Sequence, residues 1–142
     1  MTDFPDLRVI DPLNTAARAV NRALTEALRP YGLSFAQFCM IDLIDRGGPH
    51  YPSSLARKLD IETSTMASTL KRAESAGFII RSADPNDKRG VVVNLTEHSR
   101  EILPNARAAV MAIEAQCAES TSAEEYESAP KLLKKITNEL KR

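Results

Sequence analysis

Apolar residues recur every three or four positions along most of this chain, the spacing that lines one face of an amphipathic helix. A first stripe predicts a helix over residues 12–28, in which Pro12 suits the first turn and Pro30 the end. A second, wider stripe begins after Ser34, a residue that can cap a helix, and ends in the turn-forming residues 47–49. Because this second stripe is wide, we expect its helix to be central.

Two shorter helical patterns follow, over residues 52–59 and within residues 62–77. Hydroxyl side chains stand at the start of each; the candidate caps are Ser53 or Ser54 for the first helix and Thr63 or Ser64 for the second. Gly77 supplies the left-handed residue that commonly ends a helix. Two short helices joined by a tight turn predict a helix-turn-helix.

Two strand-like runs, residues 78–81 and 91–95, then flank a charged loop and predict a β-hairpin. After the hairpin, Thr96 can cap a long helix whose inward stripe reaches Cys117. A last helix has Thr121 or Ser122 as its candidate cap and Glu124 or Glu125 as the residue that completes a capping box. The C-terminal part is therefore predicted to be a hairpin followed by two helices.

This order of elements predicts a mainly α protein with a small β-hairpin, in which N- and C-terminal helices flank a winged helix-turn-helix. We expect residues 1–142 to form a single domain, with residues 34–96 as the winged part. The terminal helices, residues 10–31 and 97–142, carry apolar stripes that need a partner surface. Packing against each other and against a second copy is the economical solution, so we expect a homodimer.

Composition narrows the class of protein without naming a partner. The chain has 142 residues, of which 43% are hydrophobic, enough for one core. Nineteen basic and 19 acidic side chains cancel, so any attraction to nucleic acid must be local. The sequence shows no secretory pattern and no run of 18 apolar residues, so we expect a cytoplasmic protein that does not bind membranes.

The segment 62–77 carries a polar face that suits DNA. If its apolar residues face inward, a step of about 100° per residue places hydroxyl and basic side chains outward. These outward residues are Ser64, Ser68, Lys71, Arg72 and Ser75. Short hydroxyls let a helix approach base edges, and cations supply contacts to phosphate or guanine. An ordinary solvent-exposed face would tolerate the same residues.

The hairpin tip offers a second contact with DNA. A ribbon beside a helix in the major groove can reach the neighbouring minor groove with one cation. Arg89 suits this role because its guanidinium is weakly hydrated and stays charged, and Asp87 can orient it through a charge-assisted hydrogen bond. Pro85 and Gly90 would shape the turn. A solvated loop would also be rich in charge, proline and glycine.

The stretch SSLARKLDIETSTMASTLKRAESAGFIIRSADPNDKRGVVVNLTEHSR, residues 53–100, resembles the winged helix-turn-helix of the MarR family of bacterial transcription regulators. Its most specific part, DPNDKRGVVVNLT, looks like the family's wing, with Asp87 and Arg89 as the Asp-x-Arg pair. The upstream YGLSFAQFCMIDLI resembles the family's second helix. Four positions depart from the family pattern. Ser68 stands where many relatives carry arginine and Lys71 where aspartate is frequent. Ala73 stands where leucine is usual, and Ser99 near a common glycine.

The resemblance implies a homodimer, built on the first, fifth and sixth helices, that binds an inverted-repeat operator. Most such proteins repress, and many release DNA when a small phenolic or aromatic carboxylate ligand binds between the dimerisation and DNA-binding parts. Together with the residue analysis, the resemblance predicts these DNA-binding residues: Ser53, Ser64, Thr65, Ser68, Lys71, Arg72, Asp87, Lys88 and Arg89. The candidate ligand contacts are Arg18, Arg22, Phe38 and Tyr51.

Other functions have weaker support in the sequence. His50 and His98 lack a nearby cysteine or carboxylate in the spacing of a triad or metal site, so we expect surface histidines and neither an enzyme nor a cofactor. Cys39 could sense oxidants, but an apolar helical setting for Cys39 and Cys117 favours buried spectators. A winged helix that binds protein instead of DNA would show an apolar outward face, which the segment 62–77 lacks.

Overall fold

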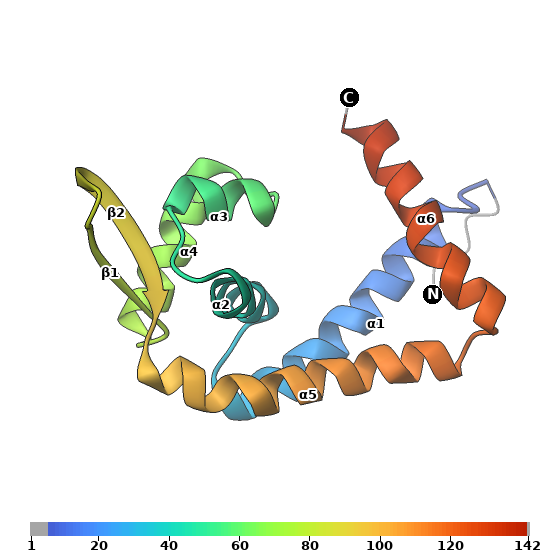
Figure 1. The fold of residues 1–142 in the computed structure, drawn as a ribbon. Coiled ribbons are helices and arrows are strands. Elements are labelled where there is room, and N and C mark those ends of the chain that lie inside the picture. The colour runs from blue at the N-terminus through green and yellow to red at the C-terminus, as the bar shows by residue number, and fades with distance from the viewer. Residues whose placement is uncertain (1–5, 142) are drawn as a thin grey trace.

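A computed structural model describes residues 6–141, apart from the side chain of Arg89. Within this range the chain is mainly α-helical with a single hairpin, as predicted (Figure 1). The elements are α1 (Ile10–Leu28), the 3-10 helix η1 (Arg29–Tyr31), α2 (Phe35–Gly47), α3 (Pro52–Lys58), α4 (Thr63–Ser75), β1 (Ile79–Asp84), β2 (Asp87–Leu95), α5 (Glu97–Glu119) and α6 (Ala123–Leu140).

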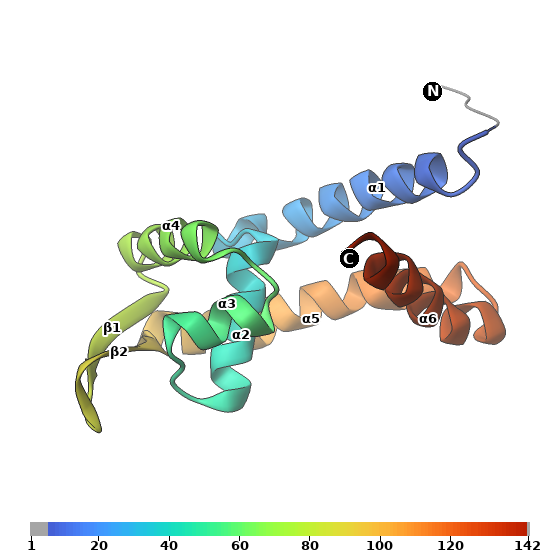
Figure 2. The same ribbon diagram turned by 90° about the horizontal axis from the view of Figure 1, so that it is seen from above.

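The elements gather at the two ends of α5, which runs along the base of the molecule in Figure 1. The hairpin, α2, α3 and α4 lie at its beginning, whereas α6 and the first turns of α1 lie toward its end (Figures 1 and 2). We call the first group, with the start of α5, the winged module, and α1, the rest of α5 and α6 the terminal helices. None of the helices described in residues 6–141 is long and apolar enough to cross a bilayer.

The hydrophobic core lies in the winged module and includes the end of α1. Met66, Leu70 and Ala73 face inward from α4, each at most 1% exposed, which confirms the predicted orientation of that helix. They pack in one cluster with side chains of α1, α2, α3, the hairpin and α5, among them Leu28, Ile41, Leu55, Val93 and Leu103. Burial of this cluster holds α4 with its polar face outward.

Several predicted helix ends are confirmed by their hydrogen bonds. Ser34 caps α2 and forms a capping box with Gln37, and Ser122 does the same for α6 with Glu125. Thr96 caps α5 by accepting a bond from the backbone N–H of Ser99. Gly77 follows α4 with φ +82°, the left-handed geometry that glycine adopts without a steric penalty.

The predicted caps of α3 and α4 are wrong. Tyr51 is the N-cap of α3, because Pro52 takes the first helical position, where its missing N–H costs nothing. Glu62 is the N-cap of α4 and makes no side-chain capping bond. Thr63 and Ser64 therefore stand inside the first turn of α4, with exposed side chains. Helix α1 also begins at Ile10, two residues before the predicted start.

The hairpin is longer than predicted, and its charged segment belongs largely to the strands. Residues Ile79↔Leu95 to Ala83↔Val91 pair in register, and the chain turns at Pro85 and Asn86. His50 forms an isolated antiparallel bridge with Val93 on the other side of β2. The expected surface position of His50 is therefore wrong: pairing with β2 leaves it 6% exposed, whereas His98 is exposed.

The terminal helices leave apolar side chains at the surface of the single chain. None of the residues of α6 is buried, and the exposed apolar residues of α1, α5 and α6 include Ile10, Val20, Met111, Leu133 and Leu140. Cys117 is exposed too, which corrects its expected burial. Its stripe on α5 extends beyond the core of the winged module, so nothing in the same chain covers it completely.

Candidate nucleic-acid interface

The outward face of α4 collects most of the residues predicted to touch DNA. Its side chains are exposed at Ser64, Thr65, Ser68, Lys71, Arg72 and Ser75. The backbone carbonyl of Thr65 accepts hydrogen bonds from Ser68 Oγ at 3.0 Å and Thr69 Oγ1 at 2.8 Å, which holds both hydroxyls against the helix. Short hydroxyls at the start of the helix and cations toward its end therefore lie on one accessible surface.

The first turn of α4 adds partial positive charge to this surface. Because Glu62 makes no side-chain cap, the side chain of the N-cap residue satisfies none of the first N–H groups of α4. Together with the aligned peptide dipoles, such N–H groups make a helix N-terminus favourable for anions. The exposed hydroxyls of Thr63 and Ser64 stand at the same end. This end of α4 is suited to a phosphate group.

The wing is attached to the helix-turn-helix by two polar contacts that sequence analysis missed. The hydroxyl of Tyr51, just before α3, donates a hydrogen bond to Oδ2 of Asp84 at the end of β1. Asp84 Oδ1 also accepts from the backbone N–H of Asn86 at 2.9 Å. Arg81 of β1 forms an ion pair with Glu74 of α4 at 3.3 Å. The hairpin is therefore held to both helices of the motif.

These contacts shift the titration of the Tyr51–Asp84 pair. The hydrogen bond from Tyr51 and the bond from Asn86 lower the pKa of Asp84, and the same Tyr51 bond, with the Asp84 charge, raises the pKa of Tyr51. Gly90 of β2 passes so close that an added Cβ would lie 3.2 Å from Cβ of Asp84. A side chain at position 90 would thus press on the carboxylate that the tyrosine holds.

An open groove of about 500 Å³ separates the wing from the helix-turn-helix. Its lining includes Ser53 of α3, Ala67 of α4 and Asp87 of β2, so the structure brings these three elements to one place. Asp87 and Lys88 are exposed on β2. The side chain of Arg89 lies outside the described part of the chain, so its pairing with Asp87 and its minor-groove role stay predictions.

The four candidate ligand contacts lie in different surroundings. Phe38 is 6% exposed in the core, and Tyr51 stands beside the wing. Arg18 and Arg22 are exposed on α1, where Arg18 donates to Thr15 Oγ1. A cavity of about 250 Å³ between α1, α2 and α5 is lined instead by residues such as Leu24, Phe35 and Val110.

Cys39 has the properties of a structural cysteine. It is half-buried against the core, and burial, together with the nearby charge of Asp42, raises the pKa of its thiol. Because the thiolate is the form that reacts with oxidants, this shift opposes redox sensing at Cys39. Among residues 6–141, no group of three or more His, Cys, Asp or Glu side chains is placed to hold a metal ion.

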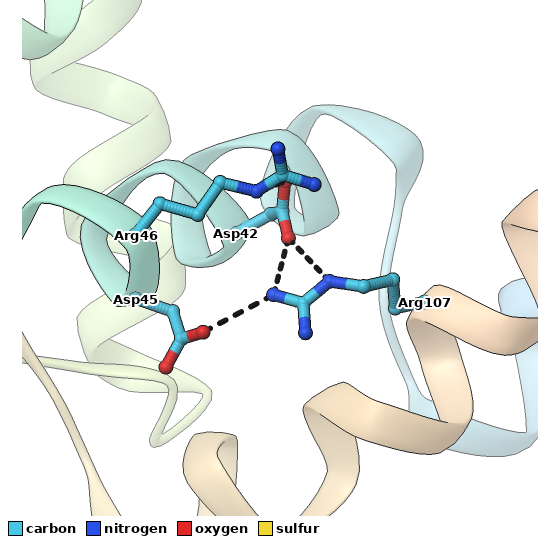
Figure 3. Close-up of polar contacts among 4 residues, drawn as sticks. All are labelled: Asp42, Asp45, Arg46 and Arg107. Atoms are coloured by element: carbon cyan, nitrogen blue, oxygen red, sulfur yellow. Dashed lines mark hydrogen bonds and ion pairs between the residues drawn. The ribbon is translucent and has the colours of Figure 1, made fainter.

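The junction between the winged module and the terminal helices contains a charged cluster, shown in Figure 3. Arg107 of α5 reaches α2, where it contacts Asp42 and Asp45, and Arg46 contacts Asp42 as well. The sequence offered no signal for this cluster, because Arg107 and Asp42 are 65 residues apart.

Comparison with known proteins agrees with this geometry. The protein-family model described as "MarR family" matches residues 33–91 of this chain. The chain is 30% identical over 132 residues to the multiple antibiotic resistance protein MarR of Escherichia coli strain K12, covering 89% of this chain and 92% of MarR. A solved structure of an E. coli MarR variant complexed with operator DNA has a TM-score of 0.78 at 28% identity, covering 95% of this chain and 99% of that chain.

Two further relatives extend the comparison. The organohalide-sensing transcriptional regulator RdhR, solved with bound 2,4-dichlorophenol, has a TM-score of 0.86 at 25% identity and covers 97% of this chain and 82% of its own. The HTH-type transcriptional regulator PecS of Dickeya dadantii strain 3937 is 33% identical over 98 residues, 67% of this chain, which spans 59% of PecS. The chain belongs to the MarR family of winged helix-turn-helix transcription regulators.

Proposed function

We propose that this protein is a dimeric transcriptional repressor that binds an imperfect inverted repeat in duplex DNA. The observation that carries the proposal is the exposed hydroxyl and basic face of α4, next to a wing that two polar contacts attach to the same module. The operator DNA in the related MarR structure supports the same partner for this chain. We therefore refer to α4 as the recognition helix.

Each predicted residue has a role in this proposal. Ser64, Thr65 and Ser68 approach base edges or phosphates in the major groove, because short hydroxyls permit close contact. Lys71 and Arg72 neutralise backbone phosphates, and Ser53 and Lys88 border the same surface. Arg89 enters the neighbouring minor groove, oriented by Asp87.

Two-fold symmetry determines the shape of the target. In a dimer, two recognition helices enter successive major grooves, about 10 to 10.5 base pairs apart. The exposed apolar residues of α1, α5 and α6 support dimerisation, because large apolar patches at a surface mark interaction sites. An inverted repeat with half-sites about one turn apart is the expected operator.

We also propose that a small aromatic ligand, a phenol or a carboxylate, releases the DNA. The bound 2,4-dichlorophenol in the related RdhR structure supports this class of ligand. A ligand shifts the dimer away from DNA only if it binds one separation of the recognition helices better than the other. Redox release through Cys39 has less support, since the pKa of its thiol is raised.

The test uses duplexes that the wild-type protein selects from a random library, with affinity measured against salt concentration. Loss of a phosphate contact makes the slope of log K against log salt shallower by about 0.9, so Lys71→Ala in both subunits should reduce it by about 1.8. Lys131→Ala, on the exposed surface of α6, is the matched control and should keep the wild-type slope. Salt-independent binding by the wild type would contradict DNA recognition and favour a protein-binding module.

A further inference from the structure

Arg107 links the terminal helices to the winged module through a set of directional contacts (Figure 3). Its Nε and Nη2 atoms donate to Oδ1 of Asp42 at 2.8 and 2.5 Å, and Nη2 also donates to Oδ2 of Asp45 at 3.1 Å. Both carboxylates belong to α2, the helix at the centre of the module. One guanidinium therefore spans two carboxylates on one face of α2.

The cluster is charge-balanced and partly protected from water. Arg46 Nε contacts the second oxygen of Asp42 at 3.0 Å, so two arginines and two aspartates share the site. The side chains of Asp42 and Arg107 are 17% and 32% exposed. Hydrogen bonds between charged groups are shorter and stronger than neutral ones, and partial burial reduces their screening by salt. The cluster can therefore define a geometry that an exposed ion pair would not hold.

Apolar packing at the same junction does not define an angle in this way. Leu103 and Ala106 of α5 are buried against the module, but apolar contacts are non-directional and tolerate small rotations. On an arm of roughly 20 Å, the length of a 13-residue helix, a rotation of about 10° moves the far end by about 3.5 Å. That displacement is close to the rise of about 3.4 Å between base pairs. A small change in the angle between α2 and α5 can therefore displace a recognition helix along the DNA by about the distance between two base pairs.

We propose that Arg107 is a positioning residue that fixes the angle between α2 and α5 and so sets the separation of the two recognition helices in the dimer. This inference rests on the proposed function, because the separation has a consequence only when α4 reads DNA. Arg107 itself contacts neither DNA nor ligand in this proposal. It acts through Asp42 and Asp45, which orient the module that carries α4.

The first experiment measures spacing preference in the full-length dimer. The probes are duplexes with two selected half-sites whose spacer varies by one and two base pairs in each direction, and a duplex with a single half-site. We expect Arg107→Met to bind the single half-site as the wild type does, and to bind the optimal spacer about 10-fold more weakly, a difference of about 1.4 kcal/mol. The Arg107→Met dimer should also discriminate less between spacer lengths, because a more mobile junction accommodates several separations of the two recognition helices.

Matched variants distinguish a positioning role of Arg107 from a general loss of folding. Asp42→Asn should also reduce the spacing preference, and the double variant with Arg107→Met should lose no more of it than Arg107→Met alone, because Arg107→Met already breaks the contact with Asp42. Asp45→Asn weakens the longer of the Arg107 contacts and should give a smaller loss of spacing preference. This variant allows the test to be made even if Arg107→Met does not fold. Arg29→Gln is the control, since Arg29 pairs locally with Glu26 on α1. Wild-type spacing preference in Arg107→Met or, failing that, in Asp45→Asn would overturn the inference.

A second experiment tests the geometry without DNA. A spin label at Ser75→Cys, on the exposed end of α4, reports the distance between the two recognition helices when Cys39→Ala and Cys117→Ser remove the native thiols. We expect one narrow distance distribution with Arg107 and a broader one with Arg107→Met; equal widths would overturn the inference. If the wild type selects no duplex, the proposed function fails, while this measurement still decides whether Arg107 fixes the junction.

Discussion

The winged module and the terminal helices differ in how much of their apolar surface one chain buries. In the module, Met66 and Leu70 of the recognition helix are each 1% exposed. In α6, by contrast, Leu132 is 60% exposed and Leu140 is 80% exposed, although the helix has a complete capping box. An amphipathic helix thus exists in both regions, but only one of them has its partner surface within the same chain.

One subunit can therefore fold the winged module by itself, whereas the terminal helices need a second subunit to bury their apolar surface. The module contains its own core, so its fold and the outward face of α4 depend on contacts within one chain. The terminal helices leave apolar surface that a second copy would cover. Changes in the module should therefore affect unfolding, and changes in the terminal helices should affect association.

The largest expected effect is a cavity in the core of the module. Leu70→Ala removes a side chain that is 1% exposed, and such changes usually cost about 2 to 5 kcal/mol of unfolding free energy. Urea unfolding at fixed protein concentration measures the loss. Ile80→Ala, at a position 52% exposed in β1, is the control and should stay within about 0.5 kcal/mol of the wild type. A Leu70 variant as stable as this control would contradict the assigned core.

The next effect should appear in association. Leu133→Asp with Leu140→Asp places two carboxylates on the apolar stripe of α6, where burial against a second copy would leave them unpaired. We expect the dimer dissociation constant to rise by at least about 100-fold, equivalent to about 2.7 kcal/mol, while circular dichroism still shows a folded module.

Sedimentation at several protein concentrations measures this change. Ser128→Asp with Asn138→Asp, at exposed polar positions on the opposite side of α6, adds the same charge and should leave the dimer intact. If both double variants associated as the wild type does, α6 would not contribute to the dimer.

A smaller effect is expected from the wing. Arg89→Ala should weaken operator binding by about 1 to 3 kcal/mol, because it removes the cation proposed for the minor groove. Dimerisation and unfolding should not change, since the adjacent Asp87 and Lys88 are exposed on β2, away from the core. A gel-shift titration with the selected duplex measures the affinity, and wild-type affinity would exclude Arg89 from the interface.

The smallest effect concerns the Tyr51–Asp84 contact and depends on pH. The pKa of Asp84 is lowered from its ordinary value of 3.8, so its stabilising contribution is present above that value and is lost as the pH falls. The pKa of Tyr51 is raised from 10.0, so its contribution is present below that value and is lost as the pH rises. The excess thermal stability of the wild type over Tyr51→Phe should therefore be greatest between these limits.

Thermal unfolding of the two proteins across the acid, neutral and alkaline ranges measures the difference. In an Asp84→Asn background, Tyr51→Phe should show no comparable pH-dependent loss, because the partner carboxylate is absent. A constant difference between wild type and Tyr51→Phe at all pH values would contradict the assigned coupling between this hydrogen bond and the charges of Asp84 and Tyr51.

Local features of the fold could be predicted well, and long-range ones could not. The caps Ser34 and Thr96 were predicted correctly, and Ser122 was one of the two candidates for α6, because the groups they bond lie within three residues. The caps of α3 and α4 were missed because the actual N-cap residues, Tyr51 and Glu62, make no side-chain capping bond that the sequence pattern could indicate. The burial of His50 also escaped prediction, since it depends on pairing with Val93, 43 residues further along the chain.

The amino-acid sequence alone determined which side of each helix is apolar, where the wing lies and which polar residues α4 presents, because these properties depend on neighbours within one or two turns. Only the tertiary structure decided that Tyr51 meets Asp84 and that Arg107 meets Asp42, across 33 and 65 residues. The physical reason is that such contacts require two elements to pack at one particular distance and angle. Periodicity specifies the face that an element buries, but not the partner side chain that it meets there.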